Sequence, residues 1–264
     1  PTLGKKPNFK RMEEISKENV LALIVESTYA SEQRKMPSEQ VAKEMLRDVL
    51  LGTDNKDNLI IVTTFSSHIA RLKAIIEFGK KLNRKILFLG RSLAKYVKAA
   101  EKIGIVGFSK DIEMVKYSRQ IERRLKKVDK DRKKYMLVVT GHQGEHKSVL
   151  YKIAKREFKF NLYPEDNVVF SCRTIPTPTN IANREALENE LKQTGVRIFK
   201  DIHQSGHAAR EDLRDFIHII KPKNIIPAHG NKEMREALAD LAEEMGYKIG
   251  KNVLMLKDGS KVAL

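Results

Sequence analysis

Residues 201–234 read DIHQSGHAAREDLRDFIHIIKPKNIIPAHGNKEM and hold four of the seven histidines of the chain. His207 and His229 each lie beside a glycine, at opposite ends of a run whose apolar residues recur at helical spacing. Lys221-Pro222 ends this run, because proline cannot continue a helix. The segment therefore predicts a strand, a helix over about residues 209–220 and a second strand. In a right-handed unit of this kind the two strands are parallel, so both histidines should emerge at one edge.

The same alternation of strand and helix extends along the rest of the 264 residues. Short, continuous apolar runs are followed by segments with helical spacing, which is typical of an α/β fold whose parallel strands are buried on both faces. The predicted strands are Leu21–Val25, Leu59–Thr63, Ile86–Leu89, Met136–Val139, Val168–Ser171, Val196–Phe199 and Asn224–Pro227. The best candidate for a joint between domains is the proline-rich stretch Thr174–Pro178.

The charge of the chain favours a polyanionic partner. The 51 Lys and Arg residues outnumber the 34 Asp and Glu residues, which gives a net charge of +17. Basic side chains displace the counterions of phosphates, so nucleic acid is the leading partner class. A lysine-rich surface that serves solubility or thermal stability is the alternative. The densest basic stretch, residues 116–134, is expected to be a solvated helix face that leads into a strand.

Composition also indicates the cellular compartment of the protein. The single cysteine, Cys172, excludes an internal disulfide and fits a reducing, cytoplasmic location. We interpret this thiol as a buried small hydrophobe. No apolar run has the length of a membrane span, so we expect no membrane partner.

Small, polar and ionisable residues follow nearly every predicted strand, at the edge where parallel α/β sheets bind ligands. Glu26, His68 and His142 are examples, in addition to His207 and His229. Two histidines on one rim could be metal ligands, a general acid or donors to an anion, or simply loop residues with satisfied hydrogen bonds. A catalytic zinc needs about three protein ligands. The residues therefore indicate part of a site.

Three segments in order resemble the motifs of the β-CASP branch of the metallo-β-lactamase fold. They are ALIVESTYA (22–30), HQSGHAAREDL (203–213) and IIPAHGNKEM (225–234). TTFSSHIARL (63–72), ILFLGRSLAKY (86–96) and VVTGHQGEH (138–146) further resemble ribonuclease J of the archaeal kind. The nearest competitor is the cleavage-and-polyadenylation type of endonuclease, whose second motif usually reads Ser-Ala-His. The order Ser205-Gly206-His207 favours ribonuclease J.

This resemblance implies a zinc-dependent ribonuclease with two zinc ions in its complete active site. His229 would be a zinc ligand, and His207 would be the catalytic residue that faces the scissile phosphate. Glu26 would be the second catalytic residue and would orient His207. The activity implied is 5′-to-3′ exonucleolytic, and the balance with endonucleolytic cleavage is left open.

The resemblance also implies a pocket for the 5′-monophosphate of single-stranded RNA. Ser66 and His68 would line one wall, with Ser205, Gly206 and Ala208 opposite. Hydroxyls, exposed amides and a helix N-terminus suit a phosphate group, so the residue types agree with this assignment.

The chain departs from the family pattern in lacking the HxHxDH metal motif before Glu26. We therefore expect it to begin inside the first domain. Residues 1–30 would be a partial metallo-β-lactamase segment, 31–185 the β-CASP domain and 186–264 the closing metallo-β-lactamase segment. The expected partners are RNA, the missing amino-terminal half of the β-lactamase domain and a second copy in a homodimer. The chain alone is expected to be inactive.

Two readings from other function classes compete with the nuclease. A non-catalytic RNA-binding module would keep the fold and the charge without the metals. Retention of Glu26, His207 and His229 argues against this module. A stand-alone α/β hydrolase is excluded because no nucleophile elbow with a serine or cysteine triad is visible.

Overall fold

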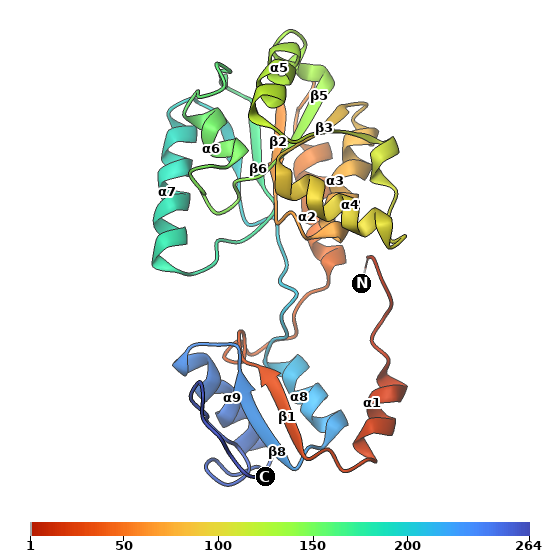
Figure 1. The fold of residues 1–264 in the computed structure, drawn as a ribbon, viewed down its shortest axis with the longest axis vertical. Coiled ribbons are helices and arrows are strands. Elements are labelled where there is room, and N and C mark those ends of the chain that lie inside the picture. Colours follow the sequence, from red (N-terminus) through yellow and green to blue (C-terminus); the bar gives the residue numbers. More distant parts are fainter. Residues whose placement is uncertain (1) are drawn as a thin grey trace. The chain divides into compact units, whose positions relative to one another are not determined.

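The computed structural model describes residues 2–264, and these form two compact units (Figure 1). Unit 1 consists of residues 2–4 and Glu39–Gln204, and unit 2 combines Lys5–Ser38 with Ser205–Leu264. The connections therefore lie later in the chain than the predicted boundaries at residues 30/31 and 185/186. A boundary at residue 185 would cut the continuous helix α7 (Pro178–Lys192). The functional domain limits stay a prediction.

Unit 1 is built on a six-stranded sheet with the order β4-β3-β5-β2-β6-β7, and all its pairings are parallel. This confirms the predicted α/β fold with a parallel sheet. The strands are β2 (Ile60–Thr63), β3 (Lys85–Leu89), β4 (Ile112–Val115), β5 (Tyr135–Val139), β6 (Asn167–Phe170) and β7 (Arg197–Phe199). Of the strands in the described part of the chain, β4 alone was absent from the sequence prediction. It is an edge strand with the sequence IEMV, and most of its residues are only half-buried, so it lacks the continuous apolar run of its neighbours.

Helices cover both faces of this sheet (Figure 1). Ile60 and Val62 pack with α2 (Glu39–Gly52), α3 (Ile69–Lys81) and α4 (Arg91–Lys102). The intervening residue Ile61 packs on the opposite face, where α5 (Ser118–Asp129), α6 (Val149–Ala154) and α7 lie. Successive strand residues point to opposite faces, so continuous apolar runs are the pattern that this three-layer arrangement needs. Helix α5 also confirms the predicted basic helix before β5. Two short 3₁₀ helices, η1 (Phe108–Lys110) and η2 (Arg132–Lys134), complete the unit.

A buried arginine joins several elements of unit 1. The fully buried Arg71 of α3 donates to both carboxylate oxygens of Glu39, at 2.6 and 2.7 Å. Its third nitrogen donates to the carbonyls of Ser171 and Ile202, each at 2.9 Å. A buried charge is tolerated only when it is paired and hydrogen-bonded, and these contacts meet that condition. The segment that follows β7 is thereby held to α2, α3 and the end of β6.

Unit 2 contains a two-stranded parallel sheet of β1 (Ala22–Glu26) and β8 (Asn224–Ala228). Three helices accompany the sheet: α1 (Phe9–Ser16), α8 (Arg210–Ile220) and α9 (Lys232–Glu244). The core of the unit gathers side chains from β1, α8, β8 and α9, among them Val25, Leu213, Ile217, Ile225 and Leu238. Segments from the two ends of the chain thus share one core.

The prediction that the strands on either side of α8 belong to one sheet is wrong. β7 pairs with β6 in unit 1, whereas β8 pairs with β1 in unit 2. Both strands have the apolar run that burial requires, but such a run does not specify which strand will be its neighbour. The register Glu26↔Ala228 is a long-range pairing that local spacing cannot reveal.

The stretch Thr174–Pro178 lies inside unit 1, as a loop that leads into α7, and does not join the units. The Thr177 side chain accepts a hydrogen bond from the Asn180 amide at 3.3 Å and so caps α7, whose first residue is Pro178. Proline is favoured at the first position of a helix, which explains its occurrence here without a domain joint.

The prediction for the single cysteine agrees with the structure. Cys172 is 1% exposed, and burial raises the pKa of its thiol to about 11, as expected for a packing residue. Among the described residues, no helix combines the length and the hydrophobicity that crossing a bilayer requires.

Candidate active site

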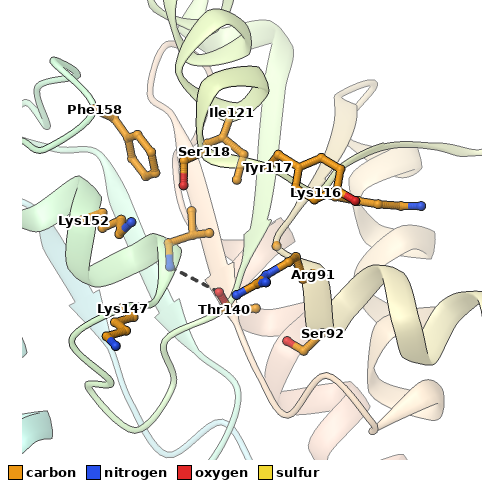
Figure 2. Close-up of a pocket in the computed structure, with 12 residues that line it drawn as sticks. Arg91, Ser92, Lys116, Tyr117, Ser118, Ile121, Thr140, Lys147, Lys152 and Phe158 are labelled. Carbon is orange, nitrogen blue, oxygen red and sulfur yellow. Dashed lines mark hydrogen bonds between the residues drawn. The ribbon is translucent and has the colours of Figure 1, made fainter.

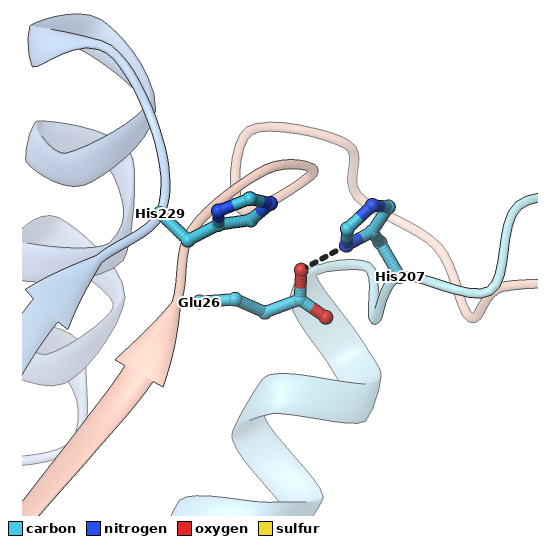
Figure 3. A group of neighbouring side chains, drawn as sticks. All are labelled: Glu26, His207 and His229. Atoms are coloured by element: carbon cyan, nitrogen blue, oxygen red, sulfur yellow. Dashed lines mark hydrogen bonds and ion pairs between the residues drawn. The ribbon is translucent and has the colours of Figure 1, made fainter.

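Glu26, His207 and His229 come together in unit 2 (Figure 3). Glu26 is the last residue of β1, and His229 directly follows β8, so the register of these two strands makes them neighbours. His207 lies on the loop before α8, and a bridge between Tyr29 and Ala209 holds that loop to the chain after β1. One ligand atom from each of the three side chains lies within 4.8 Å of the others.

Hydrogen bonds hold the Glu26 carboxylate against His207. One carboxylate oxygen contacts Nδ1 of His207. That oxygen also accepts from Thr28 Oγ1 at 3.2 Å, and the other accepts from the Ala208 amide at 3.1 Å. A carboxylate on Nδ1 selects the tautomer in which this nitrogen carries the proton, which leaves Nε2 available on the opposite side of the ring. The arrangement orients His207 for proton transfer or for contact with an anion.

His229 has an unusual backbone conformation. Its φ of 46° is in the left-handed region, which costs a residue other than glycine on the order of 1 kcal/mol of conformational free energy. Its exposed ring is stacked on His207, with ring centroids 5.4 Å apart and an interplanar angle of 24°. The Ser27 hydroxyl donates to the Ala228 carbonyl at 2.9 Å and fastens the end of β8 to the loop after β1. Residues around the turn therefore place the His229 imidazole beside His207.

The three side chains fit part of a zinc site. An imidazole is a good zinc ligand, and the exposed His229 ring has no hydrogen-bonded side chain opposite its nitrogens among the described residues. Glu26 pairs with Nδ1 of His207, which leaves only Nε2 of that ring, whereas both ring nitrogens of His229 are without such a partner in the described part of the chain. This favours His229 as the ligand within the group. A catalytic zinc takes about three protein ligands, so His229 would act together with others.

The predicted phosphate residues of unit 1 lie at the carboxyl edge of its sheet. Ser66 Oγ is 3.0 Å from Ser92 Oγ, and either hydroxyl can donate. His68 caps α3 by accepting from the Arg71 amide at Nδ1, 3.1 Å away, and its Nε2 is 3.5 Å from a Glu39 oxygen. Burial lowers the pKa of His68, so this ring stays neutral near pH 7.

The predicted phosphate residues of unit 2 precede α8. Ser205 Oγ accepts from the His207 amide at 3.1 Å, and Gly206 follows it in the chain. The Ala208 amide donates to Glu26, which differs from its predicted contact with phosphate. Ser66 and His68 belong to unit 1 and the other three residues to unit 2, so a shared pocket stays a prediction.

Sequence reasoning missed the residues that support this group. Thr28, besides its contact with Glu26, lies with Oγ1 3.2 Å from the His229 carbonyl, and Ser27 holds the end of β8. Their position directly after Glu26 in ESTYA was the available signal, since hydroxyls at a strand end commonly bond neighbouring backbone.

The half-buried His203 of unit 1 predicts a loss of stability in acid. Burial lowers the pKa of His203 to about 4 from its ordinary 6.5. Between these values the unfolded chain binds a proton that the folded chain does not, so stability falls as the pH drops from 6.5 to 4. The ring is partly exposed, so we expect a loss of about 1–2 kcal/mol after solvent screening. Urea unfolding followed by circular dichroism at pH 7 and pH 4.5 measures it.

His203→Gln should make the loss of stability smaller by the contribution of this one ring, whereas the same change at the exposed His146 of unit 1 should leave the loss unchanged. An unchanged dependence in His203→Gln would assign the acid sensitivity to other groups.

Two known protein families match parts of this chain. Residues 57–189, half of the chain, match the family described as ribonuclease J, beta-CASP domain. Residues 194–255 match a second family, the Zn-dependent metallo-hydrolase RNA specificity domain. The chain belongs to the ribonuclease J β-CASP family. The resemblance that the three motifs indicated is thereby confirmed.

Proteins named ribonuclease J align with almost the whole chain. The one from Pyrococcus abyssi is 44% identical over 261 residues, and the one from Methanocaldococcus jannaschii is 43% identical over 262. A third, from Sinorhizobium meliloti, is 30% identical over 269 residues. These alignments cover 99%, 98% and 100% of the chain but 57%, 58% and 45% of the respective relatives. The chain thus spans little more than half the length of its archaeal ribonuclease J relatives.

Proposed function

We propose that the whole protein is a zinc-dependent ribonuclease that hydrolyses RNA phosphodiester bonds, and that this chain contributes its β-CASP and carboxyl-terminal parts. The observation that carries the proposal is the convergence of Glu26, His207 and His229 at the end of the β1–β8 sheet. The names of the relatives support the same activity and do not favour the non-catalytic module or the cleavage-and-polyadenylation type.

Each residue of the group has a role that follows from its contacts. Glu26 holds the Nδ1 proton of His207 and stabilises the charged imidazolium. His207 presents Nε2 to the scissile phosphate, where it donates a proton to the leaving oxygen or steadies the developing negative charge. His229 holds one of two zinc ions together with ligands from elsewhere in the whole protein. Bound zinc supplies Lewis-acid stabilisation of charge on the phosphate oxygens.

The proposed 5′-phosphate contacts are Ser66, His68, Ser205 and Gly206. The neutral ring of His68 and the hydroxyls of the two serines offer hydrogen bonds that suit a phosphate. Ala208 would join them only after its amide releases Glu26. The preferred substrate is therefore proposed to be single-stranded RNA with a 5′-monophosphate.

An exposed apolar residue on β1 is evidence that a further segment packs against this strand. Ile24 of β1 is 69% exposed, whereas Leu23 and Val25 on either side of it pack in the core of unit 2. Ile24 therefore lies on the outer face of a two-stranded sheet, and an exposed apolar side chain there supports a segment that covers this face. We propose that the part of the whole protein that carries the remaining zinc ligands packs there. A homodimer and a cytoplasmic location remain predictions.

The test measures zinc and RNA cleavage in the whole protein and in this 264-residue chain. We expect about two zinc ions per whole protein, and faster cleavage of 5′-monophosphorylated RNA than of the same RNA with a 5′-hydroxyl. The chain alone should bind RNA without cleaving it. A whole protein that binds RNA but holds no zinc and cleaves nothing would instead be an RNA-binding module.

The net charge predicts a steep salt dependence of RNA binding. Each neutralised phosphate contributes about −0.7 to the slope of log K against log salt for a single strand. With five such contacts, affinity should fall about 100-fold between 50 and 200 mM salt. Fluorescence anisotropy with a labelled single-stranded oligonucleotide measures the slope. A flat dependence would assign the excess of basic residues to solubility alone.

A further inference from the structure

Unit 1 contains a cavity of about 660 Å³ whose lining includes no residue of the Glu26 group (Figure 2). It opens where β3, β4 and β5 end, at the carboxyl edge of the sheet. Small-molecule sites commonly have this size and this position in α/β folds. Its lining is Gly90, Arg91, Ser92, Lys116, Tyr117, Ser118, Ile121, Thr140, Lys147, Val149, Lys152 and Phe158.

The lining is strongly basic. It includes four basic side chains and no Asp or Glu. Figure 2 shows Arg91 on the α4 side and Lys147 and Lys152 on the opposite side, while Lys116 extends away from them. Among the described residues, none of these cations has a carboxylate within ion-pair distance, although the nearby Arg124 of α5 pairs with Glu113. Like charges that share a cavity without carboxylates repel each other, so a bound anion would stabilise them.

Two helix N-termini reinforce this preference for an anion. α4 begins at Arg91 and α5 at Ser118, both have 12 residues, and neither has a side-chain cap. The first-turn amides therefore lack the usual capping oxygen, and a phosphate can supply one. Gly90 has a φ of +136°, and a Cβ there would lie 2.7 Å from the Thr140 methyl group. Glycine thus allows the ends of β3 and β5 to approach closely beneath the cavity.

An aromatic side chain completes the lining. Tyr117 is 60% exposed at the start of α5. Aromatic rings beside a basic groove are the platforms on which proteins stack nucleic-acid bases. Ser92 at the rim shares a hydrogen bond with Ser66, which connects this cavity to a proposed 5′-phosphate residue within unit 1.

We propose that this cavity binds a nucleoside phosphate unit. Arg91, Lys147, Lys152 and the first turns of α4 and α5 hold the phosphate, and the base stacks on Tyr117. The unit can be part of an RNA strand or a free nucleotide, since both present the same groups. The site goes beyond the proposed function, because it uses neither zinc nor the Glu26 group and its test depends on binding alone.

The test compares single charge removals in the full chain. Arg91→Gln and Lys152→Gln are compared with Lys98→Gln, which removes an exposed charge from the same helix α4 outside the cavity. A labelled single-stranded RNA with a 5′-hydroxyl is titrated in EDTA, and AMP is titrated separately by calorimetry. Thermal unfolding verifies that each variant is folded.

We expect each cavity variant to weaken RNA binding about tenfold. The slope of log K against log salt should also become shallower by about 0.7, the contribution of one phosphate contact. Lys98→Gln should change the affinity less than about twofold. Tyr117→Ala should weaken RNA binding at least about fivefold. AMP that binds, competes with the RNA and loses affinity in Arg91→Gln would identify a free nucleotide as a ligand. RNA effects without AMP binding would place the cavity on the path of the strand.

Equal affinities in the cavity variants and in Lys98→Gln would overturn the site. A normal affinity in Tyr117→Ala, with weakened binding in Arg91→Gln and Lys152→Gln, would overturn the nucleoside assignment, since the cavity would then bind phosphate alone.

Discussion

Replacing His207 by alanine in the whole protein is expected to lower the rate constant of RNA cleavage about 10²–10⁴-fold, with zinc content unchanged. His207 is held by Glu26 through Nδ1, and its opposite nitrogen is the group proposed to face the phosphate. Its loss removes proton donation but no zinc ligand. Single-turnover kinetics on 5′-monophosphorylated RNA, together with metal analysis of the same sample, measures both quantities.

Glu26→Gln tests how His207 is oriented. An amide cannot stabilise the imidazolium as a carboxylate does, so cleavage should slow and its pH profile should shift while zinc is retained. The matched control is His218→Ala, an exposed histidine on α8, which should cleave normally. Loss of zinc in His207→Ala would contradict the catalytic assignment and make His207 a metal ligand.

The second large effect concerns His229. His229→Ala is expected to lose zinc and RNA cleavage together, with the rate falling at least about 10³-fold, because Lewis-acid stabilisation is worth several kcal/mol. The exposed imidazole of His229 has no hydrogen bond to Glu26, unlike that of His207, so it is the member of the group proposed to bind zinc. Zinc stoichiometry after dialysis and cleavage rates at a fixed zinc concentration measure the loss.

The backbone of His229 requires a second substitution, because alanine at a φ of 46° adds strain as well as removing the ring. Asparagine tolerates this left-handed conformation better and is a poor zinc ligand. His229→Asn should therefore fold like the original chain and still lose zinc. Full zinc occupancy in His229→Asn would refute the role of His229 as a ligand.

The buried strands and the three motif residues were open to prediction from the sequence. Continuous apolar runs such as those of β2 and β5 are a local signal of burial on both faces, and they lie where the sequence predicted. β4 was missed because a half-buried edge strand carries no such run. Glu26, His207 and His229 stood out because each occurs in a short motif with a family resemblance.

The supporting contacts were beyond sequence reasoning. In the sequence, Arg71 does not differ from the other basic residues of the predicted helices. In the structure it is fully buried and donates hydrogen bonds to Glu39, Ser171 and Ile202. The basic cavity of unit 1 is lined by Arg91, Lys147 and Lys152, which come from different segments of the chain. Ala208 looked like a free amide donor, but its hydrogen bond goes to Glu26.

The sequence by itself determined the α/β class, the basic character and the identity of the Glu26, His207 and His229 group, because apolar periodicity, composition and short motifs are local properties. Only the tertiary structure decided that β8 pairs with β1 and not with β7, and hence how the two histidines meet. The physical reason is that parallel pairing joins strands far apart in the chain. Any strand with an apolar run can satisfy the burial requirement, so its partner is selected by packing in the complete core.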